Sequence, residues 1–220
     1  LVYDKGELTI PEFLEILDDN FEGHEAFRSK LLIDTPKYGN DDDYADNIMF
    51  DIFDTYANIV TGKPTYRGGQ YRINMLPTTC HVYFGSVIGA TPDGRFAHKP
   101  LSEGISPVQG VDRGGPTAVV NSAARMDHLR TGGTLLNQKF TPSLVKGENG
   151  LRMMGNLIRT YFDKDGHHIQ FNVVNRDTLI EAQKNPEEHR DLIVRVAGYS
   201  DYFRNLDLEL QNEIIARTEQ

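Results

Sequence analysis

The sequence is poor in cysteine, since Cys80 is the only one among its 220 residues. A single thiol excludes a disulfide framework within the chain, and it excludes an iron–sulfur cluster held by several cysteines of this chain. A lone cysteine is more often a small buried apolar residue than a reactive one, and we expect Cys80 to be buried.

Long apolar runs and positive charge are also scarce. No run approaches the roughly 18 apolar residues that a membrane-spanning helix needs, and the mean hydropathy is −0.46. The 23 lysines and arginines face 32 acidic residues, giving a net charge of −9. This balance argues against nucleic acid or a membrane as a partner. The N-terminus shows neither a signal peptide nor a basic presequence, so we expect a cytoplasmic protein.

The length of the sequence is that of one or two domains, and its start leads us to expect part of a larger protein. Hydrophobic residues make up 39% of the chain, which is enough for one large or two small packed domains. The chain begins at Leu1 without a methionine, and its opening segment has the texture of the middle of a protein. We therefore expect a C-terminal fragment of a longer polypeptide.

Helical signals dominate the first third of the chain. Thr9-Ile10-Pro11-Glu12 has the form of a capping box with Thr9 as the N-cap, and an apolar stripe follows to about Asn20. A second helix is expected over 25–32, and the acidic run 41–43 starts a third. Apolar residues at helical spacing in the third helix are interpreted as core: Ile48, Met49, Ile52, Phe53, Tyr56, Ile59 and Val60.

Short apolar runs separated by loops rich in glycine and proline follow from Tyr66, and they are typical of strands. Strands are expected over 71–76, 81–88, 116–121, 133–140 and 168–174. Helices are expected over 151–161, 177–184 and 206–217. Alternating strands and helices predict an α/β fold with a largely parallel sheet.

The most informative stretch lies at 194–203. An apolar, strand-like run over 192–196 leads to Gly198, which lacks a Cβ and allows a tight turn or close approach by another group. Taken alone, this is a strand that ends in a glycine turn. However, Arg195-Val196-Ala197-Gly198-Tyr199 followed by Phe203 resembles the signature of the glycyl radical enzymes, the pyruvate formate-lyase-like superfamily.

Other loops extend the resemblance from about residue 66 to the end, whereas it is thin before that. The segments that resemble the family's glycine radical domain are 89–95, 100–107, 132–140, 166–174 and 214–219. The resemblance implies that residues 1–96 are the C-terminal part of the barrel domain and that residues 97–220 form the glycine radical domain. The implied fold is the C-terminal part of a ten-stranded α/β barrel, with the glycyl radical loop inserted in the barrel interior.

The resemblance assigns the chemistry to Gly198, which would lose one Cα hydrogen and store an unpaired electron. A radical at Cα flattens toward sp² geometry, and a side chain there would clash and offer other hydrogens to lose. By the same resemblance, Arg195, Tyr199, Tyr202 and Phe203 support the radical loop. The aromatic rings would pack it, and Arg195 would anchor it through hydrogen bonds to a carboxylate or a carbonyl.

The resemblance also implies partners and a reaction. An activating enzyme that cleaves S-adenosylmethionine at a [4Fe–4S] cluster would install the radical, and no cofactor would be bound by the chain itself. The full-length protein would be an oxygen-sensitive homodimer of anaerobic metabolism. It would belong to the dehydratase and C–X lyase branch and would break a C–O, C–N or C–S bond of a small polar substrate.

Cys80 does not fit the family's Cys-x-Glu motif, which lies several hundred residues before the glycine. The cysteine that forms the thiyl radical and its glutamate base are therefore absent here, and we expect the fragment alone to be inactive. An alternative function is a stand-alone glycyl radical module that docks onto a damaged radical enzyme. The helical segment 9–62 favours the lyase, because such a module needs only the radical domain.

Metal and phosphate sites are not predicted. The side chains of His167 and His168 point to opposite faces if they lie in a strand, so they cannot share one ion. The segment 163–166 starts like a calcium loop, but its glycine and its twelfth position do not match. The glycine-rich stretches 110–115 and 132–133 lack a nucleotide-binding fingerprint and are interpreted as turns.

Overall fold

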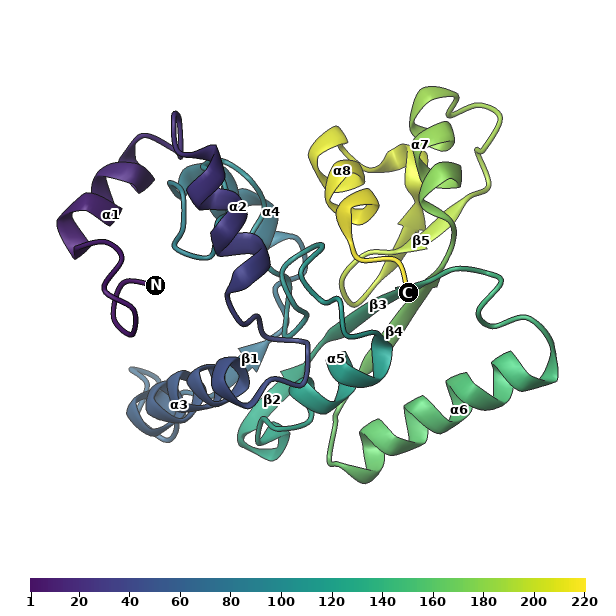
Figure 1. The fold of residues 1–220 in the computed structure, drawn as a ribbon. Coiled ribbons are helices and arrows are strands. Elements are labelled where there is room, and N and C mark those ends of the chain that lie inside the picture. Colours follow the sequence, from purple (N-terminus) through teal and green to yellow (C-terminus); the bar gives the residue numbers. More distant parts are fainter. The chain divides into compact units, whose positions relative to one another are not determined.

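The structure is a computed structural model that describes residues 1–220 (Figure 1). The chain forms two compact units. Unit 1 comprises Leu1–Pro36 and Cys80–Leu101, and unit 2 comprises Lys37–Thr79 and Ser102–Gln220. None of the helices has both the length and the apolar character that are needed to cross a membrane. The family domain boundary predicted at residue 96 stays a prediction.

Unit 1 is helical and contains α1 (Ile10–Asp18), α2 (Glu25–Asp34) and α4 (Cys80–Val87). The predicted capping box at the start of α1 is confirmed, because the Thr9 N–H donates to Glu12 Oε2 at 2.8 Å and the Glu12 N–H donates to Thr9 Oγ1 at 3.4 Å. The core of this unit is built on Ile16, Phe21 and Leu31.

The strand predicted over 81–88 is wrong, since residues 81–87 belong to α4. The aromatic and β-branched residues favour a strand, but such propensities are easily overridden by packing. Gly85 shows how closely this helix is packed. A Cβ on Gly85 would lie 2.2 Å from the Lys99 carbonyl oxygen. The expectation that Cys80 is buried is also wrong. Cys80 is the exposed first residue of α4, whose buried positions are His81 and Gly85.

Unit 2 contains the remaining elements. Its helices are α3 (Asp43–Val60), α5 (Pro116–Ala123), α6 (Gly147–Asp163), α7 (Arg176–Lys184) and α8 (Leu208–Ala216), with 3₁₀ turns η1 (His128–Arg130) and η2 (Phe203–Asn205). Its strands are β1 (Ile73–Met75), β2 (Thr131–Thr134), β3 (Leu136–Phe140), β4 (Ile169–Val173), β5 (Ile193–Arg195) and β6 (Ser200–Tyr202).

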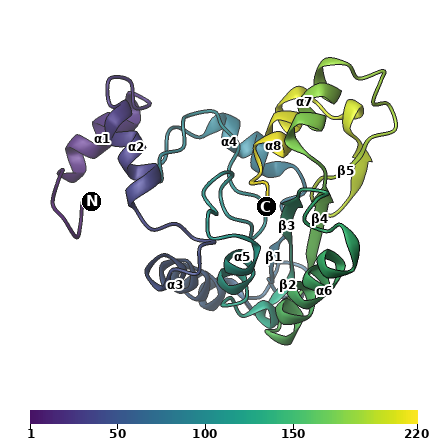
Figure 2. The ribbon, with the colours of Figure 1, turned by 45° about the vertical axis from the view of Figure 1, so that its right-hand side comes forward.

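The strands form three pairs, so the chain is a mixed α/β structure, in agreement with the predicted class. β1 pairs with β2 and β3 with β4 in parallel, and β5 and β6 form an antiparallel hairpin. β3 and β4 lie side by side in both views of the ribbon (Figures 1 and 2), in register from Leu136↔Ile169 to Phe140↔Val173. These pairs do not close a barrel within residues 1–220.

The strand predicted over 116–121 is also wrong, because α5 occupies this segment. Pro116 takes the first helical position, where its missing N–H costs no hydrogen bond. Gly115 precedes it with φ +82°. Val119, Val120 and Ala123 are buried, as one face of a helix requires.

The prediction that the apolar residues of α3 are all core is only partly correct. Phe53 is buried, and Met49 and Val60 are partly buried against the same core. A neighbouring face is exposed over five large side chains, which we call the α3 stripe: Tyr44, Ile48, Ile52, Tyr56 and Ile59. The residues described here therefore cover only one of the two apolar faces of this helix.

Candidate functional site

Gly198 lies in the turn of the β5–β6 hairpin. The hairpin pairs Arg195 with Ser200, and beyond them the Val196 N–H donates to the Tyr199 carbonyl at 2.8 Å. Gly198 has φ +85°, a value that glycine adopts readily and other residues adopt only with strain. A glycine turn was predicted at this position, and the backbone explains why glycine suits it.

The residues before the turn are buried, whereas the turn itself is not. Val196 and Ala197 are 0% and 1% exposed, but Gly198 lies at the exposed surface of the described residues. A Cβ at Gly198 would meet a single neighbour, Leu135 Cδ1, at 3.6 Å, which is ordinary van der Waals contact. Within residues 1–220, Leu135 is therefore the only neighbour close to this position, although the base of the hairpin is buried.

The predicted loop-supporting residues take different positions. Phe203 is fully buried, while Tyr199 and Tyr202 are 38% and 44% exposed. The Arg195 Nε donates to the side-chain carbonyl of Gln170 at 2.6 Å. Its Nη1 donates to Ser200 Oγ at 3.3 Å. The roles assigned to these four residues stay predictions.

Two buried asparagines hold the backbone just before the turn. Asn172 of β4 bonds to Arg195 twice, accepting from its N–H at 2.7 Å and donating to its carbonyl at 2.7 Å. Asn137 of β3 donates from Nδ2 to the Val196 carbonyl at 3.1 Å. The same Nδ2 donates to Glu103 Oε1, and Gln170 donates from Nε2 to Asn137 Oδ1.

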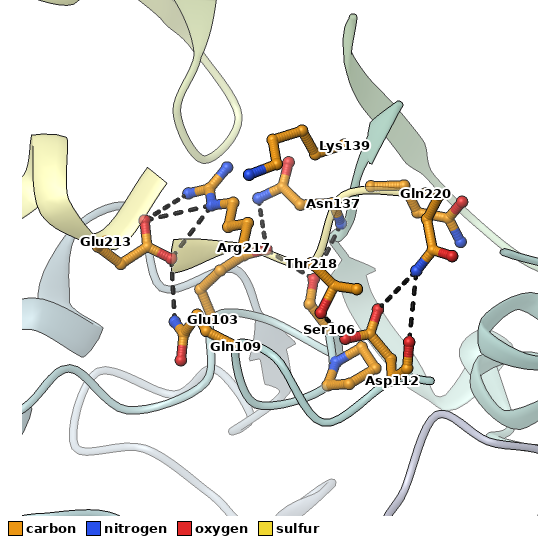
Figure 3. A pocket seen from close by; sticks show the side chains of 12 residues that line it. Glu103, Ser106, Gln109, Asp112, Asn137, Lys139, Glu213, Arg217, Thr218 and Gln220 are labelled. Atoms are coloured by element: carbon orange, nitrogen blue, oxygen red, sulfur yellow. Dashed lines mark hydrogen bonds and ion pairs between the residues drawn. The ribbon is translucent and has the colours of Figure 1, made fainter. Parts of the chain in front are cut away.

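A cluster of buried ionisable side chains lies next to this network. Glu103, Glu213, Arg217 and Lys139 line a small polar pocket, which Figure 3 shows. Arg217 Nη2 lies 2.8 Å from Glu213 Oε2, and Arg217 Nη1 donates to the Arg195 carbonyl at 3.3 Å. The guanidinium therefore joins the end of α8 to the base of the hairpin.

Burial shifts the ionisation of two groups in the cluster. It raises the pKa of the Glu103 carboxyl, and this effect outweighs the nearby Arg217 guanidinium and the hydrogen bond from Ser106, which both favour the charged form. Burial also lowers the pKa of the Lys139 ammonium to about 8. Lys139 Nζ donates to the Ile215 carbonyl at 3.1 Å near the C-terminal end of α8.

Glu103→Gln is expected to flatten the dependence of stability on pH. The native chain holds a proton on Glu103 at pH values where the unfolded chain has lost it, so this group's contribution to stability falls as pH rises from about 4.5 through the native pKa. In Glu103→Gln, the decrease in the free energy of unfolding with rising pH should be smaller by up to ~1.4 kcal/mol per pH unit in that window. Urea unfolding at several pH values measures the slope.

Glu209→Gln is the control for this measurement, because Glu209 is exposed on α8. It should leave the slope unchanged. An unchanged slope in Glu103→Gln as well would contradict a raised pKa for Glu103.

Comparison with known proteins identifies the family. The family described as "Glycine radical" matches residues 101–204, and the family described as "Pyruvate formate lyase-like" matches residues 1–85. The two matches follow one another along the chain. The chain belongs to the glycyl radical enzymes.

Relatives of this chain include a dehydratase and a sulfite-lyase. It is 62% identical to trans-4-hydroxy-L-proline dehydratase of Clostridioides difficile and 44% identical to isethionate sulfite-lyase of Oleidesulfovibrio alaskensis, over its full length in both cases. It spans 28% and 27% of the lengths of these relatives.

Solved structures agree with the sequence comparison. The crystal structure of the hydroxyproline dehydratase from Clostridioides difficile with trans-4-hydroxy-L-proline bound has a TM-score of 0.97 and 61% identity. The glycerol-bound B12-independent glycerol dehydratase from Clostridium butyricum has a TM-score of 0.94 and 47% identity. Each match covers all of this chain and 28% of the other chain.

Sequence reasoning missed the polar network next to the Gly198 hairpin, which comprises Glu103, Asn137, Gln170, Asn172, Glu213 and Arg217. A usable signal was present in β4, where the polar residues Gln170 and Asn172 alternate with Ile169, Phe171 and Val173. Alternation usually marks a solvent-facing polar side, but here both amides are buried. Uncharged amides, in place of charged residues, at these positions are compatible with burial.

Proposed function

We propose that Gly198 stores the unpaired electron of a glycyl radical dehydratase. The observation that carries this proposal is the position of Gly198 within the glycine radical match, at the turn of a hairpin whose base is held by buried side chains. The backbone on the N-terminal side of this carbon is fixed by hydrogen bonds from the side chains of Asn137 and Asn172. The positive φ favours glycine at the same position.

The radical would be formed on Gly198 and then used through successive hydrogen transfers. An activating enzyme transfers one electron from its [4Fe–4S] cluster to S-adenosylmethionine, which splits into methionine and a 5′-deoxyadenosyl radical. That radical takes one Cα hydrogen from Gly198 and becomes 5′-deoxyadenosine. The glycyl radical then takes the hydrogen of a cysteine thiol outside these residues.

The resulting thiyl takes a hydrogen atom from a substrate C–H bond. In a dehydration, the neighbouring hydroxyl group takes up one proton and leaves as water. The substrate radical gives up one proton, so no net proton is consumed. The product radical then takes back the hydrogen of the thiol. The net reaction is loss of one water, and the thiyl is regenerated.

We propose a hydroxylated amino acid of the trans-4-hydroxy-L-proline type as the substrate to test first. The support is the difference in identity, which is 62% to the hydroxyproline dehydratase and 44% to the isethionate sulfite-lyase. The named substrates belong to those relatives. Most substrate contacts of the whole enzyme would come from outside residues 1–220.

We further propose that this chain is the C-terminal portion of a cytoplasmic homodimeric enzyme with a ten-stranded barrel. In the intact enzyme, residues 1–96 would form the C-terminal part of the barrel domain and residues 97–220 would form the glycine radical domain. The exposed α3 stripe and the exposed Gly198 both support this proposal, because each needs a cover that the described residues do not supply. The barrel interior would shield the Gly198 loop from water and oxygen.

Electron paramagnetic resonance of the anaerobically activated full-length enzyme tests the radical assignment. The single hydrogen left on Cα couples to the electron, so the expected signal is a doublet. Incorporation of glycine deuterated at Cα should collapse the doublet to a singlet, whereas alanine deuterated at Cα should leave it unchanged. A doublet that persists with deuterated glycine would place the radical on another residue type.

A further inference from the structure

The backbone before Gly198 is held by side chains in the manner of a neighbouring strand. Asn172 accepts from the N–H and donates to the carbonyl of one residue, Arg195, at 2.7 Å each. A side-chain amide carries the same donor and acceptor as a peptide group, so this pair reproduces the two bonds exchanged between paired strand residues. Asn172 therefore acts as a one-residue strand partner for the end of β5.

Asn137 extends this hold to the next peptide. Its Nδ2 donates to the Val196 carbonyl and to the Glu103 carboxyl oxygen Oε1, and its Oδ1 accepts from Gln170 Nε2. Turning the amide over would place its oxygen against two acceptors and its nitrogen against a donor. The orientation of Asn137 is therefore fixed by three partners, and with it the position of the Val196 carbonyl.

Burial makes these contacts strong. Asn137 and Asn172 are 8% and 5% exposed, so water does not readily replace a lost bond. Gly198 itself has no side chain and is exposed. Consequently, the placement of its Cα depends on the peptides at Arg195 and Val196, to which the two asparagines are bonded.

We propose that Asn172 and Asn137 are positioning residues that place the Gly198 Cα for hydrogen abstraction. This inference rests on the proposed radical role of Gly198. It adds that the speed of radical formation is set by two amides that do not touch the reacting carbon.

The test is the rate of radical formation in the full-length enzyme carrying Asn172→Asp. This isosteric change keeps the acceptor for the Arg195 N–H but places a carboxylate oxygen against the Arg195 carbonyl. With saturating activating enzyme, the maximal rate of radical formation should fall by about tenfold to a hundredfold. The concentration of activating enzyme that gives half the maximal rate should stay within about twofold of the wild-type value.

Asn40→Asp is the matched control. The Asn40 side chain also bridges backbone groups of unit 2, donating to the Val111 carbonyl at 2.9 Å and accepting from the Arg113 and Gly114 N–H groups at 2.7 and 2.8 Å. This variant should lower the melting temperature but keep the wild-type rate of radical formation. If Asn40→Asp slowed radical formation as much as Asn172→Asp does, the slower rate would be explained by general destabilisation. That result would overturn the proposal.

The possible failures are distinguishable. If the wild-type enzyme forms no radical at Gly198, the proposed function falls and this inference falls with it. If the wild-type enzyme forms the radical and Asn172→Asp forms it at the same maximal rate, only the positioning role is overturned. If Asn172→Asp does not fold, Asn172→Ser decides instead, because a serine hydroxyl cannot reach both backbone groups of Arg195 and the same rate loss is expected.

Discussion

Gly198→Ala is expected to abolish the radical signal and all turnover of the full-length enzyme while leaving the protein folded. The methyl group of alanine would hinder a planar Cα radical, and its hydrogens offer other sites of abstraction. The structural cost is small, because the added Cβ would meet only Leu135 at 3.6 Å. The positive φ accounts for about 1–2 kcal/mol of strain.

Gly68→Ala separates this chemical effect from backbone strain. Gly68 has φ +83°, and a Cβ added there meets nothing within 4 Å. The two variants should therefore lose similar stability, as measured by thermal unfolding. Only Gly198→Ala should lose the electron paramagnetic resonance signal. A signal of wild-type intensity in Gly198→Ala would refute the assignment of the radical to this carbon.

Arg217→Leu is expected to cause the largest loss of stability. The guanidinium forms a buried ion pair with Glu213, with 8% and 0% of the two side chains exposed, and it also lies near Glu103 and bonds to the Arg195 carbonyl. Without it, two carboxyl groups remain in a buried site without their nearest guanidinium. The free energy of unfolding should fall by ~3–5 kcal/mol, measured by denaturant unfolding.

Two further variants show whether burial is the cause. Arg204 pairs with Glu187 at 3.5 Å on the surface, where 37% and 81% of the side chains are exposed. Arg204→Leu should therefore cost less than about 1 kcal/mol. The double variant Glu213→Leu with Arg217→Leu should regain part of the loss, because the Glu213 carboxylate is then no longer left buried without its guanidinium. Equal losses in Arg217→Leu and Arg204→Leu would contradict this account.

Local signals in the sequence were sufficient for the capped helix α1 and for the parallel strands β3 and β4. They were insufficient for α4 and α5, where β-branched and aromatic residues suggested strands. In α5, the Gly115-Pro116 pair marks a helix start, and this signal outweighs the valines that follow. In α4, the close approach of Gly85 to the Lys99 backbone is a tertiary contact that no local pattern contains.

The candidate site was predictable at Gly198 because a specific motif surrounds it. Its supporting network was not predictable, because the partners come from β3, β4, α8 and the loop at Glu103, which are far apart in the sequence. Asn172, for example, bonds to Arg195 of a hairpin that lies 23 residues further along the chain. Periodicity shows which residues share a face, but it does not show what that face meets.

The α3 stripe has a practical consequence for anyone who produces residues 1–220 by themselves. Five large apolar side chains on one side of a helix would be in contact with solvent, and such surfaces favour self-association. Purified preparations of this piece should elute as mixed oligomers in size-exclusion chromatography. Spectroscopic or crystallographic work is therefore better begun with the intact polypeptide.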